Sequence, residues 1–152
     1  MSDDPAEGDR LLLDTHVALW LDAGVPLLPK ATADLIERCR ARGGTIHLSA
    51  VSAWEIALLA DAGRVVLDAT PAEWVRRFVS RPGVAALPLT ADAAARAYSG
   101  DLARLPQRDP GDRLLAAVAI AERMPLVTHD RKLLDFAATH GRAHGFLALA
   151  GA

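Results

Sequence analysis

Short apolar runs alternate along this chain with longer segments of helical periodicity, and this alternation restricts the folds open to it. Four runs are short and apolar enough to be buried strands, at 11–14, 45–49, 84–87 and 126–128. A fifth run at 146–149 is a weaker candidate for an edge strand. Strands that alternate with helices form βαβ units with right-handed crossovers. The sequence therefore predicts an α/β fold in which a parallel sheet of four or five strands is covered by helices on both faces.

Helix boundaries are marked by capping residues and glycines. Thr15 and Thr90 are each placed to cap the helix that follows, and Gly43 and Gly63 are placed to end one. The segment 52–55, Ser-Ala-Trp-Glu, matches the capping box, in which the fourth residue bonds back to the first. The predicted helices cover 15–21, 30–42, 52–62, 71–80, 91–98, 112–123 and 132–138, and a polar connection covers 100–110.

A length of 152 residues and a net charge of −2 fit one globular domain with no general attraction to polyanions. We expect a disordered tail at 1–10 and a single domain at 11–152. One cysteine, Cys39, excludes a disulfide framework and a zinc site built from cysteines. The N-terminus lacks the pattern of a signal peptide, and no apolar run reaches the length of a membrane span, so we expect a cytoplasmic protein that does not enter the membrane.

The position of the acidic residues is more informative than their number. Asp14 and Asp130 each end an apolar run, and Glu55 and Asp112 each stand near the start of a predicted helix. Ligands of open parallel sheets bind outside the carboxyl ends of the strands, so we expect these acids to meet there. Clustered carboxylates require a cation, and oxygen ligands favour Mg²⁺, with Mn²⁺ as a substitute. The alternative for each acid is an ordinary helix cap, and for Glu55 it is the capping box.

Four motifs that contain these acids resemble the PIN domain, and within it the VapC-type ribonuclease toxins of bacterial type II toxin–antitoxin pairs. They occur in the family's order and at similar spacing over about residues 11–136. The motifs are LLDTH at 12–16, SAVSAWEI at 49–56, DPGDRLLAA at 109–117 and LVTHD at 126–130. The ordered set is specific, whereas any one of the motifs alone is not.

This resemblance implies a three-layer α/β/α sandwich, and an endoribonuclease that hydrolyses RNA with water activated by Mg²⁺. By motif, the catalytic acids are Asp14, Glu55, Asp112 and Asp130. Asp14 and Asp112 are expected to be the direct metal ligands. The outer shell is expected to contain Glu55, Asp109, Thr128 and Asp130, with the Thr128 hydroxyl bonded to Asp14 or Asp130.

Basic residues beside the acids are candidates for contact with the RNA backbone. Arg113, Arg131 and Lys132 are the first choices, because each lies close in sequence to a proposed ligand. Arg104 and Arg108 are weaker candidates of the same kind. For each of them the alternative is an ordinary solvated helix end.

The chain departs from the VapC-type pattern at three positions. Gly111 stands where a large apolar residue is common, Gln107 where a histidine is common, and Leu59 where a basic residue is common. None of these departures removes a carboxylate, so they bear on substrate contacts and loop rigidity more than on metal binding. His16 and His129 flank acids, and contact with the substrate or a purely structural role would explain either of them.

The leading hypothesis is a toxin that cleaves RNA, is inhibited by a small antitoxin protein and, as the resemblance implies, forms a homodimer. Transfer, ribosomal and messenger RNA are all open as substrates, as are one and two metal ions. One alternative is a non-catalytic PIN-like module that binds RNA or a protein partner. Another is a metal-dependent phosphatase of a different α/β fold, which would turn over small phosphomonoesters and leave RNA intact.

Overall fold

The structure, a computed structural model, describes residues 10–24, 28–106, 108–141 and 148–149. Its centre is a five-stranded sheet with the order β3-β2-β1-β4-β5, in which every pair of neighbours is parallel. The strands are β1 (Arg10–Leu13), β2 (Thr45–Ser49), β3 (Val84–Leu87), β4 (Leu126–Val127) and β5 (Ala148–Leu149). The predicted parallel sheet is confirmed, including the edge strand at its C-terminal end.

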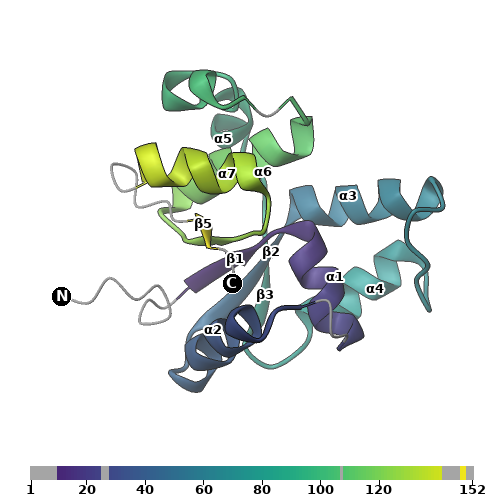
Figure 1. The fold of residues 1–152 in the computed structure, drawn as a ribbon. Helices are drawn as coiled ribbons and strands as arrows, with labels where there is room; N and C mark the ends of the chain where they lie inside the picture. The colour runs from purple at the N-terminus through teal and green to yellow at the C-terminus, as the bar shows by residue number, and fades with distance from the viewer. Residues whose placement is uncertain (1–9, 25–27, 107, 142–147, 150–152) are drawn as a thin grey trace.

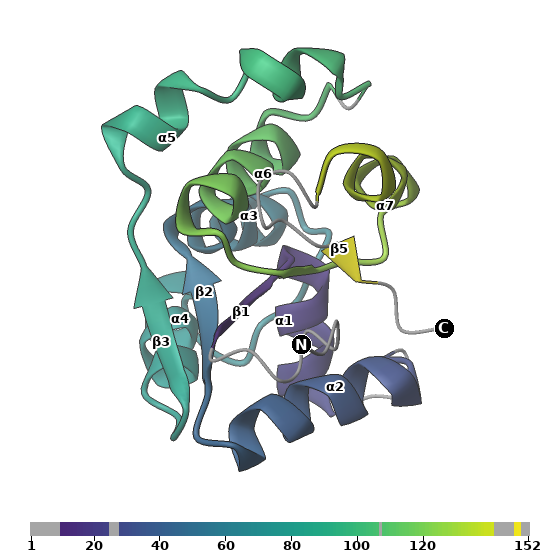
Figure 2. The same ribbon diagram turned by 90° about the vertical axis from the view of Figure 1, so that its left-hand side faces the viewer.

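Helices cover both faces of the sheet, as the alternation of elements predicts (Figures 1 and 2). The helices are α1 (Thr15–Ala23), α2 (Lys30–Ala41), α3 (Ala50–Asp61), α4 (Pro71–Val79), α5 (Ala91–Ala95), α6 (Pro110–Glu122) and α7 (Arg131–Phe136). On β1, Leu12 packs with residues of α5, α6 and α7, whereas Leu11 and Leu13 pack with residues of α1, α2 and α4. Successive side chains of a strand point to opposite faces, so the three consecutive leucines of β1 supply both layers of the core.

The direction of chain progression across the sheet reverses at β1. β2 and β3 are added on one side of β1, and β4 and β5 on the other. Such a reversal leaves a crevice at the carboxyl ends of the two strands that flank it, here β1 and β4. Asp14 directly follows β1, and Thr128, His129 and Asp130 directly follow β4. Strand order alone therefore brings together residues that are more than a hundred positions apart.

Two helices begin earlier than predicted, because other residues cap them. Ser49 caps α3 and accepts a hydrogen bond from the N–H of Val51, so this helix starts at Ala50 rather than near Ser52. Asp109 caps α6, which starts at Pro110 rather than at Asp112. Proline at the first helical position costs nothing there, because its missing N–H would have no partner in the helix.

Smaller differences concern the ends of elements. Arg10 belongs to β1 rather than to the predicted tail, and its guanidinium donates to the carbonyl oxygen of Glu122 at 2.7 Å; residues 1–9 lie outside the described part. Helix α5 is shorter than predicted, and the connection after it contains the 3₁₀ helix η2 (Gly100–Arg104). α7 continues into a π turn, η3 (Ala137–Gly141). Within the described ranges, no helix combines the length and apolar character needed to cross a bilayer.

Candidate active site

Five acids line one cavity of about 380 Å³ at the carboxyl ends of β1 and β4. Asp14 enters it from the end of β1, Glu55 from α3, and Asp130 from the loop after β4. Asp109 and Asp112 enter it from the start of α6. The structure thus gathers in one place all four acids that the sequence singles out as catalytic, together with Asp109.

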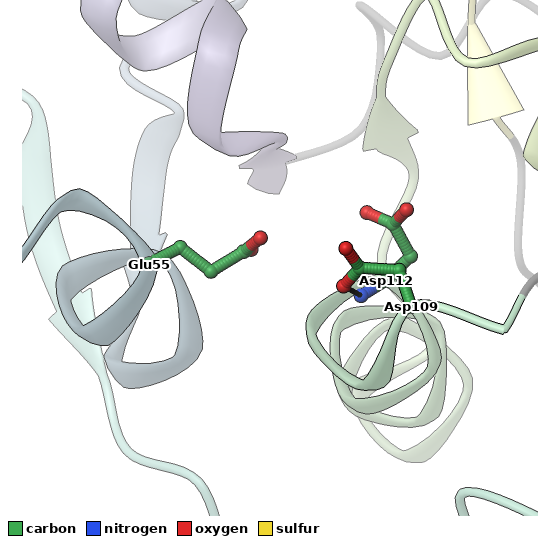
Figure 3. A group of neighbouring side chains, drawn as sticks. All are labelled: Glu55, Asp109 and Asp112. Atoms are coloured by element: carbon green, nitrogen blue, oxygen red, sulfur yellow. Dashed lines mark hydrogen bonds between the residues drawn. The ribbon is translucent and has the colours of Figure 1, made fainter. Parts of the chain in front are cut away.

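Three of these carboxylates form a tighter group. One oxygen each of Glu55, Asp109 and Asp112 lies within 4.8 Å of the others, with Glu55 reaching from α3 toward the other two on α6 (Figure 3). Two oxygens bound to one Mg²⁺ lie at most about 4.2 Å apart, twice the metal–oxygen distance, so small movements of these side chains would let them share one cation. Asp109, which the sequence assigns to an outer shell, lies in this inner group, whereas Asp14 lines the same cavity outside it.

Asp14 is held by bonds to both of its carboxylate oxygens. Its Oδ1 accepts a hydrogen bond from the N–H of Thr15 at 2.7 Å, and its Oδ2 accepts one from the hydroxyl of Thr128 at 2.6 Å. The Thr128 hydroxyl in turn accepts from the N–H of Asp130 at 3.1 Å, so it links the two strand ends. The predicted supporting bond of Thr128 is therefore present, and it goes to Asp14. With Asp14 only 9% exposed, its orientation is fixed before any ligand arrives.

The predicted capping box at Glu55 is wrong. Since Ser49 caps α3, Glu55 lies in the second turn of the helix and does not bond back to Ser52. Its Oε1 instead accepts a hydrogen bond at 2.8 Å from the hydroxyl of Thr15, which also lies 3.0 Å from the hydroxyl oxygen of Ser52. Glu55 is thereby directed toward α6. Thr15 was expected only to cap a helix, and its role in holding Glu55 has no local sequence signal.

The capping role considered for Asp112 belongs to Asp109. Oδ1 of Asp109 accepts hydrogen bonds from the N–H groups of Gly111 at 2.8 Å and Asp112 at 3.3 Å. Asp112 stands in the first turn of α6 with its carboxylate in the cavity. The backbone dipoles of α6 favour negative charge at the N-terminus of this helix, which partly offsets the repulsion among the acids.

Crowding and burial raise the pKa values of the acids in the cavity. Burial, followed by the charges of Asp14, Asp109, Glu55 and Asp130, raises the pKa of Asp112 to about 8. Burial is also the main cause that raises the pKa of Glu55 to about 7, opposed by the hydrogen bond from Thr15. Burial raises the pKa of Asp14 despite the bond from Thr128. Half-buried carboxylates with raised pKa values form a donor set suited to a divalent cation, which would favour their ionised form.

The basic residues predicted to contact RNA differ in their surroundings. Arg113 is 8% exposed, and its guanidinium donates to the carbonyl oxygens of Ala97, Leu102 and Leu105 at 2.6–3.0 Å. The prediction that Arg113 contacts RNA is therefore wrong. This side chain instead holds the segment 97–105, which contains η2, against α6. Arg131 and Lys132 are exposed at the start of α7, and Arg104 and Arg108 are exposed as well.

Arg64 lines the acid cavity, and it was not among the predicted site residues. It follows Gly63, which the sequence does identify as a helix end, but nothing in the local sequence shows where the chain turns next. Leu59, one of the departures from the VapC-type pattern, lines the cavity too. Gln107, another departure, lies outside the described residues.

Comparisons with known proteins agree with this fold. The family model of the PIN domain matches residues 11–139. Ribonuclease VapC22 of Mycobacterium tuberculosis is 33% identical over 130 residues, which cover 81% of this chain and 88% of that protein. The crystal structure of VapBC2 from Rickettsia felis bound to a promoter DNA fragment has a TM-score of 0.60 at 18% identity, covering 93% of this chain and 98% of that one. A toxin–antitoxin complex from Klebsiella pneumoniae has a TM-score of 0.54 at 16% identity, covering 90% and 95%. The chain therefore belongs to the PIN domain family, as a relative of the VapC-type ribonucleases.

Proposed function

We propose that this protein is a divalent-metal-dependent endoribonuclease that acts as the toxin of a toxin–antitoxin pair in the cytoplasm. The observation that carries the proposal is the inner group of Glu55, Asp109 and Asp112 beside the buried Asp14. Support also comes from a relative that is named as a ribonuclease and from structural neighbours that are toxin–antitoxin complexes. No cysteine or histidine is needed to complete the oxygen donor set, which suits Mg²⁺ and also Mn²⁺.

The acids divide into those that would hold the cation and those that shape the site. Asp14 and Asp112 remain our proposed direct ligands, and the inner group adds Glu55 and Asp109 as ligands or as acceptors for ordered water. When bound, a divalent cation lowers the pKa of water and offsets the charge that develops on an attacked phosphodiester. Asp130 caps α7 by accepting from the N–H of Leu133 at 3.1 Å, and it lines the cavity on the side of β4.

Proton release accompanies cation binding in this proposal. With pKa values of about 7 for Glu55 and about 8 for Asp112, both carboxyl groups hold protons for part of the time near neutral pH. Ligands must be deprotonated to bind metal, so cation binding displaces these protons. Glu55, oriented by Thr15, is then a carboxylate close to the reacting phosphodiester and is our candidate to accept a proton from the attacking water.

An antitoxin and a second copy of the chain are the proposed protein partners. Trp54 and Leu58 are each 49% exposed and stand four residues apart on α3, so they share one face of the helix. Exposed large apolar side chains in a cluster are typical of interaction surfaces. A partner with an arginine-bearing tail would also suit a cavity lined by five carboxylates.

The proposal is tested by cleavage of RNA with Mg²⁺ by the wild type and by Asp14→Asn. We expect the substitution to lower the rate by at least about a hundredfold, because it removes a charge at the centre of the site. Asp61→Asn, on an exposed acid at the end of α3 outside the cavity, is the matched control and should leave the rate unchanged.

Equal rates for the wild type and Asp14→Asn would refute the assignment. Failure to bind Mg²⁺ or Mn²⁺ in a calorimetric titration at neutral pH would point to a non-catalytic binding module. Turnover of small phosphomonoesters with no cleavage of RNA would point to a phosphatase.

A further inference from the structure

The acid cavity adjoins a second and larger cavity. The second cavity has a volume of about 740 Å³ and is lined by α1 and by the segment between α3 and α4, together with Trp74. His16, Trp20, Leu59 and Arg64 line both cavities, and we refer to these four residues as the shared wall. Sites for small organic ligands have volumes of about 300–1,000 Å³, so the second cavity has room for a nucleoside.

Arg64 is brought to the shared wall by the turn that ends α3. Gly63 adopts a left-handed conformation with a φ of 71°, and the N–H of Arg64 donates to the carbonyl oxygen of Leu59 at 2.9 Å. The chain thus leaves the helix at Gly63, and the exposed Arg64 side chain joins the lining of the acid cavity. Gly63 is suited to this turn because a left-handed conformation is costly for residues with a Cβ atom.

Arg64 brings a positive charge to a wall that adjoins five carboxylates. The described lining of the acid cavity contains five carboxylates, and Arg64 is the one lysine or arginine among those lining residues. Arg113, which is nearer in sequence to the acids, has its guanidinium committed to backbone carbonyl oxygens. An anionic substrate that approaches the acids through the second cavity therefore meets the guanidinium of Arg64, whose fork matches a phosphate.

Aromatic rings stand beside Arg64. The ring centroids of His16 and Trp20 are 6.0 Å apart, and those of Trp20 and His129 are 5.8 Å apart. All three side chains line the acid cavity, and a contact of 3.3 Å between Nε2 of His129 and Oγ1 of Thr32 anchors the histidine ring. Unstacked bases of single-stranded RNA are commonly bound by stacking on such rings.

We propose that the shared wall is a nucleotide subsite for single-stranded RNA. Arg64 pairs with a backbone phosphate, and Trp20, flanked by His16, stacks on the base of a nucleotide adjacent to the phosphodiester held at the acids. The proposal rests on the proposed function, since it identifies how that same site takes its substrate. A purely apolar occupant, such as a side chain of a protein partner, would account for Leu59 and Trp20 but would leave Arg64 without a ligand among the contacts of this wall.

The test is the binding of fluorescein-labelled 2′-O-methyl oligonucleotides in the presence of Mg²⁺, followed by anisotropy and checked by gel to be intact. Arg64→Ala should weaken binding about tenfold and lower the slope of log K against log salt by about 0.7, the contribution of one phosphate contact on a single strand. Arg64→Lys should retain part of the affinity. Arg76→Ala, an exposed arginine of α4 that lines neither cavity, is the matched control and should change neither quantity by a comparable amount.

The stacking part is tested with Trp20→Ala and Trp20→Phe. Loss of one stacked base weakens binding about tenfold, so Trp20→Ala should do so and Trp20→Phe should largely rescue it. A probe with one abasic nucleotide at the stacked position should bind the wild type as weakly as Trp20→Ala binds the intact probe, and the two losses should not add. Circular dichroism checks that each variant is folded, and Arg64, being exposed, keeps the test valid if Trp20→Ala is unstable.

Unchanged affinity in both Arg64→Ala and Trp20→Ala would overturn the subsite. The occupant of the shared wall would then be a side chain of a protein partner. Because binding is measured without turnover, this failure is separable from failure of the proposed function. A wild type that binds the probe through Arg64 and Trp20 but cleaves no RNA would keep the subsite and refute the nuclease. A wild type that cleaves RNA, together with variants of Arg64 and Trp20 that bind the probe normally, would keep the proposed nuclease and refute the subsite.

Discussion

The carboxylate of Glu55 occupies the space that a side chain on Gly111 would need. A Cβ atom on Gly111 would lie 2.6 Å from Cδ and 2.7 Å from Oε2 of Glu55, and 3.1 Å from Oδ1 of Asp109. Carbon atoms do not approach each other this closely, so the end of the flexible Glu55 side chain would have to move. The glycine that departs from the VapC-type pattern therefore permits the close approach of Glu55 to the start of α6. Its effect falls on the arrangement of the acids, not only on loop rigidity.

Replacement of Gly111 by alanine should separate activity from stability. Alanine is favoured over glycine inside a helix by up to about 1 kcal/mol, so Gly111→Ala should fold at least as stably as the wild type. The displaced Glu55 should lower Mg²⁺ affinity and RNA cleavage about 10- to 100-fold, the range expected when the environment of metal ligands is disturbed. Thermal unfolding, calorimetry and cleavage assays measure the three quantities.

A second substitution tests whether the loss in Gly111→Ala acts through Glu55. Glu55→Asp shortens the side chain by one methylene and makes room for the new Cβ atom. The double variant should therefore lose less activity than the sum of the two single losses. Strict additivity, or wild-type Mg²⁺ affinity in Gly111→Ala, would show that Gly111 does not control the position of Glu55.

The sequence predicts the sheet and the meeting of the acids well, because both follow from short-range pattern and topology. Leu11, Leu12 and Leu13 can only be a buried strand, and Asp14 must then stand at its carboxyl end. Which residue caps a helix is harder to predict. Ser49 and Ser52 are equally good caps by composition, and the choice depends on where β2 ends in the folded sheet.

The surroundings of single side chains are the least predictable part of the site. The burial of Arg113 depends on three carbonyl oxygens in 97–105, a segment whose path is set by its packing on α6. Arg64 reaches the cavity because the chain turns out of α3 at Gly63 and because α1 lies on the other side of the cavity. The surroundings of both arginines depend on contacts between distant segments, so the neighbouring residues in the sequence carry no signal for them.

The metal-free protein should lose stability as the pH rises through the neutral range. The folded-state pKa values of Glu55 and Asp112, about 7 and about 8, lie above their ordinary values of 4.5 and 3.8. The folded state therefore binds more protons than the unfolded state between these limits, and the free energy of unfolding falls with increasing pH. Mg²⁺ competes with these protons, so its stabilising effect should grow over the same interval. Thermal unfolding between about pH 6.5 and 9, with and without Mg²⁺, measures both trends.

Asp112→Asn is the control for this pH dependence. It removes one titrating group, so the decline with pH should be shallower and stabilisation by Mg²⁺ should largely disappear. Measurements are best kept above about pH 6.5, because burial lowers the pKa of His47, whose charging destabilises the fold at lower pH. A metal-free wild type whose stability rises between pH 7 and 9 would contradict the raised pKa values of the acids.

Substitution of Arg113 should affect folding and not RNA binding. Arg113→Leu would remove the guanidinium donor from the carbonyl oxygens of Ala97, Leu102 and Leu105, of which Leu102 keeps the hydrogen bond from the N–H of Leu105 at 3.1 Å. It would also remove the contact with the Tyr98 ring, whose centroid lies 4.5 Å from Cζ. We expect a loss of about 3 kcal/mol in the free energy of unfolding, because buried acceptors are costly to leave unpaired. Denaturant unfolding measures this loss, and the salt dependence of RNA binding by the folded fraction should be unchanged.

The matched comparison for Arg113 is the pair Arg131→Ala and Lys132→Ala. Both side chains are exposed at the start of α7, beside the capping residue Asp130. If they hold the RNA backbone, each substitution should weaken binding and lower its salt dependence while leaving unfolding nearly unaffected. A large loss of stability in these two variants, with none in Arg113→Leu, would reverse the roles assigned to the three residues.

Thr15 should act as a positioning residue whose removal shifts the pH dependence of cleavage. Thr15→Val keeps the shape of the buried side chain but removes the hydroxyl that donates to Oε1 of Glu55 at 2.8 Å. This bond lowers the pKa of Glu55, so its loss should raise that pKa further. The acidic limb of the pH–rate profile should then move to higher pH, and the rate at neutral pH should fall.

Thr15→Ser restores the hydroxyl and should return the pH–rate profile toward that of the wild type. A merely structural role of Thr15 would lower the amount of folded protein and leave the shape of the profile unchanged, so the shift itself is the decisive readout. The distance of 3.0 Å between the hydroxyl oxygens of Thr15 and Ser52 provides a further check. Ser52→Ala should have a smaller effect in the same direction, because Thr15 keeps its bond to Glu55 but loses the neighbour that helps to orient it.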